Sequence, residues 1–116
     1  MSDLEAVPGV MSAILRRESS GELVLAPGLA LEVIEACSSS GVAVLGIEMF
    51  PGLNVSTYDQ HLKAPADEKL WSGYVRANKA LAEDFLRKNL ATSTECILTT
   101  ASWREFCEIQ RESEKL

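Results

Sequence analysis

The side chains of this 116-residue sequence that could do chemistry are few, and their spacing matches no catalytic or metal-binding motif. His61 is the single histidine, so a metal site with histidine spacing cannot be built, and it is the one histidine available as a base. Cys37, Cys96 and Cys107 form no C-x-x-C pair and occupy apolar, periodic positions, which predicts reduced structural thiols. We therefore expect no catalytic residue, no metal site and no cofactor, which favours a binding protein over an enzyme.

The sequence also contains no glycine-rich phosphate-binding loop. Neither G-x-G-x-x-G nor G-x-x-x-x-G-K-[ST] occurs, which argues against a nucleotide site. Two carboxylates, Glu48 and Asp59, could act as an acid/base pair or hold a divalent cation if the fold brought them together. A small enzyme that uses these carboxylates or His61 is the weakest alternative, and it requires a concave pocket with perturbed carboxylates.

The distribution of charge is more informative than the net charge of −6. Residues 1–62 contain eight acidic and two basic residues, whereas residues 63–116 contain nine of each, so the excess negative charge lies in the first half. No Lys or Arg occurs between residues 18 and 62. This pattern argues against nucleic acid as a partner, because binding its phosphates requires Lys and Arg. Two interpretations stay open, a solvated acidic face or a face that steers the protein onto a basic partner.

Glu48 stands out because it interrupts the most apolar segment of the chain, VAVLGIEMF at residues 42–50. The predicted strand places it on the same side as Val44, Gly46 and Phe50. A carboxylate there must reach water, be paired or contact a partner, since leaving it buried and unpaired is costly.

Five further residues are candidate partner contacts. Tyr58 and Asp59 follow a predicted strand and open a loop that contains His61, and aromatic residues in such loops often anchor interfaces. The alternative is that Tyr58 packs on a helix, Asp59 caps a turn and His61 is an exposed loop residue. Glu32 and Glu35 share a narrow polar face of a predicted helix.

Hydrophobic periodicity and Gly/Pro punctuation divide the chain into helices and strands. Helices are predicted over residues 29–38 and 67–90 and from residue 103, and a short helix is predicted near Met11 to Leu15. Strands are predicted over residues 22–26, 42–50, 54–58 and 95–101. The long helix is expected to bury Leu70, Tyr74, Ala77, Leu81 and Phe85, with Trp71, Val75, Ala82 and Leu86 alongside.

The last helix carries its own start signal. Ser102 and Glu105 have the S-x-x-E spacing of a capping box, which predicts a helix that begins at Trp103. Periodicity then directs Phe106 and Ile109 inward.

These elements predict a single α+β domain over residues 1–116, in which a small sheet of three to four strands packs against helices. The middle portion matches the split βαββαβ order of ferredoxin-like folds; without the strand at 54–58 it would be a simpler sandwich. The ends, residues 1–20 and 111–116, are expected to fray. No secretory signal or membrane-length apolar stretch is apparent, so we expect a cytoplasmic protein with no membrane contact.

Residues 41–59 carry a resemblance to a known family. The helix followed by GVAVLGIEMF, a turn, and STYD resembles the bacterial polymorphic-toxin immunity proteins, particularly the immunity protein 40 type, over residues 28–90. Gly46 is followed here by Ile47 and Glu48, where the family pattern has a second small residue and an acid, and Gln60 follows the TYD. The positions that match are Glu48, Tyr58 and Asp59.

The resemblance implies a small non-enzymatic inhibitor that binds and neutralises a cognate protein toxin delivered by neighbouring cells. It also implies an acidic surface that covers a basic cleft, which agrees with the charge distribution. Glu32, Glu35, Glu48 and Asp59 are the expected acidic contacts. The competing hypothesis is a homodimeric scaffold or adaptor, which requires a large apolar patch on the long helix or an open sheet edge.

Overall fold

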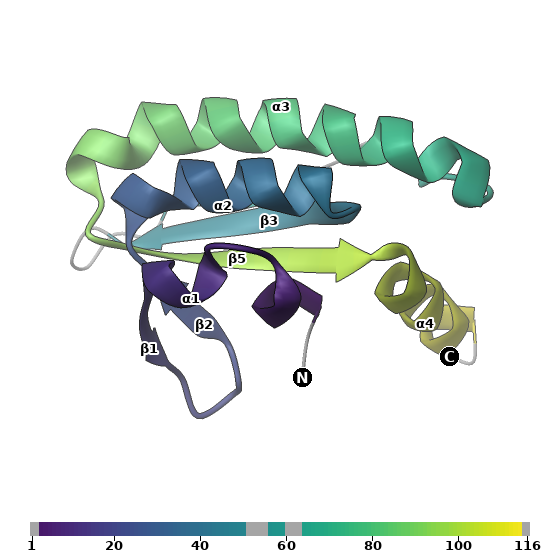
Figure 1. The fold of residues 1–116 in the computed structure, drawn as a ribbon, viewed down its shortest axis with the longest axis horizontal. Helices are drawn as coiled ribbons and strands as arrows, with labels where there is room; N and C mark the ends of the chain where they lie inside the picture. The colour runs from purple at the N-terminus through teal and green to yellow at the C-terminus, as the bar shows by residue number, and fades with distance from the viewer. Residues whose placement is uncertain (1–2, 51–55, 60–63, 115–116) are drawn as a thin grey trace.

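The computed structural model describes residues 3–50, 56–59 and 64–114 (Figure 1), and for residues 56–59, 113 and 114 it describes the backbone alone. The short N-terminal elements are η1 (Asp3–Ala6), α1 (Val10–Ala13), β1 (Ile14–Arg17) and β2 (Leu23–Leu25). The middle of the chain forms α2 (Pro27–Ser39), β3 (Val42–Phe50) and β4 (Ser56–Asp59). The remainder forms η2 (Glu68–Leu70), α3 (Trp71–Asn89), η3 (Leu90–Thr92), β5 (Glu95–Ser102) and α4 (Trp103–Glu114).

The strands form one antiparallel sheet in the order β1-β2-β5-β3-β4. The α+β class and the β3–β4 hairpin are confirmed. Along the chain, β2 to β5 follow the βαββαβ order, but the spatial order is not ferredoxin-like, because β5, the last strand, lies between β2 and β3. The ferredoxin-like arrangement keeps its last strand at an edge, so that part of the expectation is wrong.

A β-bulge in β3 decides which residues face the core. Val44 lies opposite Thr100 and Gly46 opposite Thr99, so β3 contains one extra residue at this point. The bulge shifts the alternation of faces: Val44 packs in the main core, and after the bulge Ile47 and Met49 do so. Glu48 therefore belongs to the opposite face with Gly46 and Phe50, and its expected placement on the same side as Val44 is wrong.

Helices α2 and α3 cover one face of the sheet, and Figure 1 shows them side by side along β3 and β5. The buried residues of α2 and of the second half of α3 meet the sheet in one cluster, together with the N-terminal segment: Leu4, Val7, Val10, Ala13, Leu23, Leu25, Ala30, Val33, Ile34, Cys37, Val42, Val44, Ile47, Met49, Ala82, Leu86, Cys96 and Leu98. The first half of α3 belongs to a second cluster, formed by Trp71, Tyr74, Val75, Ala43, Ala101 and Phe106. The N-terminal segment thus belongs to the core instead of fraying, and Ile14 and Leu15 lie in a strand instead of a helix. Burial of this apolar surface is the main driving force for the fold.

Helix α3 buries a different stripe from the one that its sequence predicts. Trp71, Val75, Ala82 and Leu86, expected alongside, are the core residues, together with Tyr74 and Asn78. Leu70 is 56% exposed and Leu81 is 41% exposed, so their expected burial is wrong. The helix has two apolar faces, and periodicity alone cannot say which of them meets the sheet.

Helix ends follow the predicted signals. Gly41 adopts φ +75°, and its amide donates to the Ser38 carbonyl at 3.2 Å, which terminates α2 as expected of a glycine in the left-handed region. The capping box at Ser102 is formed, and α4 begins at Trp103. Phe106 is buried as predicted, whereas Ile109 is 48% exposed and does not point inward.

No helix in the described ranges combines the length and the apolar composition needed to cross a membrane.

Candidate functional site

The β3–β4 hairpin places three of the six residues singled out for partner binding, Glu48, Tyr58 and Asp59, on neighbouring strands. Backbone pairing places Tyr58 opposite Ile47, Thr57 opposite Glu48 and Asp59 opposite Gly46. Residues two apart on a strand share a face, so the register assigns Asp59 and Glu48 to the same face of the sheet, on neighbouring strands. We call this the β3–β4 acidic face, defined by Glu48 and Asp59. Strand β4 is an edge strand, so this face ends at the margin of the sheet.

The Glu48 carboxylate is half-buried between apolar neighbours. Ile47 and Met49 on either side of it are buried, and its cross-strand neighbour on β5 is the buried Ile97. Within the described part of the chain the carboxylate has no hydrogen bond or ion pair, so a cationic partner could contact it.

A second charged group, the Glu95 carboxylate, lies on the same face of the sheet, beside the end of β3. Glu95 is paired opposite Phe50, and its carboxylate binds the Arg16 guanidinium in a two-pronged contact, with Nη2 to Oε1 at 3.0 Å. Arg16 Nε also donates to Glu18 Oε1 at 3.0 Å. The hydrogen bond from Arg16 holds the pKa of Glu95 below its ordinary value, and the Glu95 carboxylate raises the pKa of Arg16. Arg16 is therefore occupied by two carboxylates and does not neutralise Glu48.

Glu32 and Glu35 lie on the other side of the sheet. Both are exposed on α2, which packs on the face that holds Val44, Ile47 and Met49. We call Glu32 and Glu35 the α2 acidic ridge. The acids expected to form one surface are thus divided into two pairs, with the sheet between them.

The α2 acidic ridge is partly neutralised by α3. Lys79 Nζ lies 2.6 Å from the Glu35 carboxylate, and this contact raises the pKa of Lys79. Glu83 is 3.8 Å from the same ammonium, which is an ion pair too long for a hydrogen bond. An open groove of about 300 Å³ between the helices is lined by Leu31, Glu32, Glu35, Glu83 and Arg87. Because Lys79 and Arg87 lie beside these carboxylates, the α2 acidic ridge is a weaker target for a cationic partner than the β3–β4 acidic face.

His61 lies outside the described residues, as does the rest of its loop at 60–63, so its predicted role stays a prediction. The side chains of Tyr58 and Asp59 are likewise outside the description, and only their register is used here.

Few of the described residues are placed where they could act in catalysis. No group of three or more His, Cys, Asp or Glu side chains in these ranges could hold a metal ion. Cys37 and Cys96 are buried, and burial raises the pKa of each thiol to about 12, so neither supplies a thiolate nucleophile near neutral pH.

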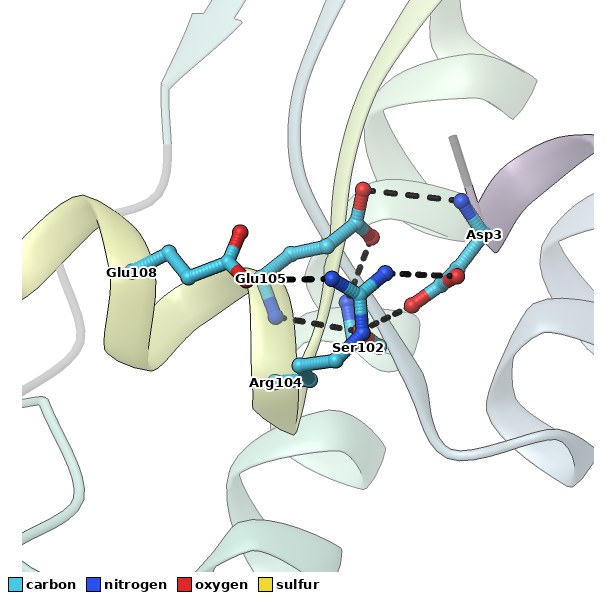
Figure 2. A network of polar contacts seen from close by, with 5 residues as sticks. All are labelled: Asp3, Ser102, Arg104, Glu105 and Glu108. Atoms are coloured by element: carbon cyan, nitrogen blue, oxygen red, sulfur yellow. Dashed lines mark hydrogen bonds and ion pairs between the residues drawn. The ribbon is translucent and has the colours of Figure 1, made fainter. Parts of the chain in front are cut away.

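One polar network went unpredicted, and it ties the N-terminus to the start of α4 (Figure 2). The Ser102 hydroxyl donates to the Asp3 carboxylate, and Arg104 Nη2 donates to Asp3 Oδ1 at 3.1 Å. The Asp3 amide lies 3.5 Å from Glu105 Oε2. No local signal could reveal these contacts, since Asp3 and its partners are about a hundred residues apart; only the capping box itself was visible in the sequence.

An aromatic cluster at the start of α3 was also not predicted from the sequence. Trp71, Tyr74, Trp103 and Phe106 pack with ring centroids 5.3 to 6.1 Å apart. Trp71 Nε1 donates to the Gly41 carbonyl at 2.7 Å, which anchors α3 to the start of β3. Two cavities adjoin the cluster, of about 380 and 410 Å³, and both are bounded by residues 64–66. The described residues in their walls are mainly apolar and include no carboxylate, so these cavities do not support the hypothesis of an enzyme that uses carboxylates.

No protein-family model matches the chain, and no match is found among the curated proteins.

Proposed function

We propose that this protein is a non-enzymatic immunity protein that binds and neutralises a cognate bacterial toxin through the β3–β4 acidic face. Glu48 and Asp59 supply the negative charge, and His61 is a further expected contact. The register assigns Tyr58 to the other face of the sheet, with Ile47, so Tyr58 is not part of this contact surface. The partner is a toxin domain with a basic surface.

The observation that carries the proposal is the β3–β4 register. It assigns Glu48 and Asp59, both named by the family resemblance, to one face at the margin of the sheet. Arg16, which contacts that face through Glu95, is already bound to Glu95 and Glu18. A basic partner would meet the Glu48 carboxylate there, and complementary charge accelerates association and selects partners.

The α2 acidic ridge has a lesser role in this proposal. Glu35 is engaged by Lys79, so the ridge contributes to the long-range negative field and not to the contact itself.

Co-expression tests the function directly. A toxin domain captured from the native organism by pull-down with this chain is induced in a host cell together with this chain, and colony survival is counted. Survival with the intact chain and death with an empty vector support neutralisation. Death in both cultures, with both proteins detected at equal levels, contradicts it.

The competing scaffold hypothesis is favoured by a separate observation, the exposed apolar residues on α3. It is compatible with toxin binding, because the exposed residues Ala77 and Leu81 of α3 are not part of the β3–β4 acidic face.

A further inference from the structure

Helix α3 carries a continuous apolar strip on its outer surface. Gly73, Ala77 and Leu81 are exposed, and their spacing of four residues puts them in line along one side of α3. Leu70, the exposed last residue of η2, precedes them at the start of the helix. We call these four residues the α3 outer stripe. The core-facing residues Trp71, Val75, Ala82 and Leu86 lie on a different side of the helix. Two exposed leucines flanking two small residues leave a hollow where a neighbouring side chain could insert.

The hollow is present in the structure. A cavity of about 380 Å³ lies over the first half of the stripe, between α3 and residues 64–66. Leu70, Gly73 and Ala77 line it, with Tyr74 beside them. A Cβ added to Gly73 would meet no atom within 4 Å, so the space above this glycine is open.

From this geometry we infer that the α3 outer stripe is a homodimer interface, in which α3 of a second copy packs antiparallel across a two-fold axis at Ala77. Gly73 and Leu81 are each four residues from Ala77, so the axis brings Leu81 of each copy over Gly73 of the other. Each leucine then fills the cavity of the opposite copy. Such an interface is isologous, as two-fold dimers require.

The charges at the two ends of α3 select the antiparallel arrangement. Asp67 and Glu68 precede its first turn, and Arg87 and Lys88 occupy its last turn. With the axis at Ala77, residue 67 of one copy lies beside residue 87 of the other, so acids meet bases at both ends. A parallel pair would place like charges together. Arg87 and Lys88 already pair with Glu83 and Asp84, but these exposed pairs are weak and can rearrange.

The stripe is short, so the dimer is expected to be concentration-dependent, with a Kd on the order of micromolar instead of nanomolar. This interface uses no residue of the β3–β4 acidic face, so it is independent of the proposed immunity function.

Sedimentation velocity over a hundredfold range of concentration measures the equilibrium. The intact chain should sediment as a monomer at low concentration and as a dimer at high concentration. Leu81→Glu and Gly73→Gln should each raise the Kd of the dimer at least tenfold. Both positions are exposed, so the protomer is expected to stay folded. Gln is also a better helix former than Gly. Ser72→Glu, exposed on a different side of α3, is the matched control and should dimerise normally.

Cross-linking tests the position of the axis. Packed helix axes lie about 8–10 Å apart, which brings facing Cα atoms within the range of a disulfide, roughly 4.4–6.8 Å. In a Cys107→Ser background, Ala77→Cys should form a disulfide-linked dimer under mild oxidation, whereas Ser72→Cys should not. A chain that stays monomeric over the whole range, or equal cross-linking at both positions, overturns the inference.

Discussion

Ser102 and Glu105 close a reciprocal pair of hydrogen bonds at the start of α4. The Ser102 amide donates to Glu105 Oε1 at 3.1 Å, and the Glu105 amide donates to Ser102 Oγ at 3.2 Å. The same Ser102 hydroxyl donates to Asp3, so one side chain joins the end of β5, the start of α4 and the N-terminal segment. Ser102→Ala should lower the free energy of unfolding by about 1–2 kcal/mol, as loss of a helix cap does.

Urea unfolding measures this change. Thr92→Ala, an exposed change in η3 whose hydroxyl bonds only to the nearby Asn89 carbonyl, is the control and should have a much smaller effect. Equal stabilities for Ser102→Ala and the intact chain would contradict the account of this junction.

The Asp3 carboxylate should make stability fall in acid. Its hydrogen bond from Ser102 and, secondarily, its contact with Arg104 hold the pKa of Asp3 below the ordinary value of about 3.9. A group with a depressed pKa stabilises the fold above its unfolded-state pKa and stops doing so as pH falls through the folded-state pKa. Asp3→Asn should therefore be less stable than the intact chain at pH 6, and the gap should shrink below about pH 4.

Urea titrations at several pH values test this dependence. Glu108→Gln removes a carboxylate that pairs with the same Arg104 but is exposed, so it should show a smaller gap. A gap for Asp3→Asn that is constant from pH 6 to about pH 3 would contradict the role of the carboxylate.

The cysteines should differ in reactivity. Cys37 and Cys96 are buried, with the pKa of each raised to about 12 by burial, whereas Cys107 is half-buried. A thiol reagent at pH 8 should therefore modify Cys107 first and the other two only after denaturation. Cys107→Ser should abolish the fast phase. A fast phase that survives this substitution would contradict the described burial.

Gly73→Ala should stabilise the protomer. Gly73 lies inside α3, its backbone is helical and a Cβ there meets open space, so alanine adds helix propensity without a clash. The expected gain is about 0.5–1 kcal/mol in the free energy of unfolding, measured at concentrations where the protein is a monomer. A loss of stability would show that the space above Gly73 is occupied in the protomer.

Local signals predicted much of the fold. Strand β3 has the predicted bounds, because a continuous apolar run flanked by Gly41 and Pro51 is readable from sequence alone. The capping box also predicted the start of α4 correctly. The order of the strands could not be predicted, since it depends on which long-range pairings form, and β5 inserts between β2 and β3.

The predictions that failed have physical causes. Leu70 and Leu81 were wrongly expected to be buried with Tyr74, because their helical spacing continues that of the core residues. The side of Glu48 was misassigned because a bulge shifts the alternation, and no residue pattern in β3 announces it. The acids could not be grouped before the sheet was known to separate the α2 acidic ridge from the β3–β4 acidic face.

The most direct test of the central claim is the rate of association with the toxin domain captured by pull-down, measured by stopped flow for two variants of equal charge. Glu48→Gln with Asp59→Asn should slow association on the order of tenfold and weaken its dependence on salt between about 0.1 and 1 M. Glu32→Gln with Glu35→Gln removes the same two charges from the other side of the sheet and should have a much smaller effect. Equal rates for the two variants, or association that does not change with salt, would contradict binding through the β3–β4 acidic face.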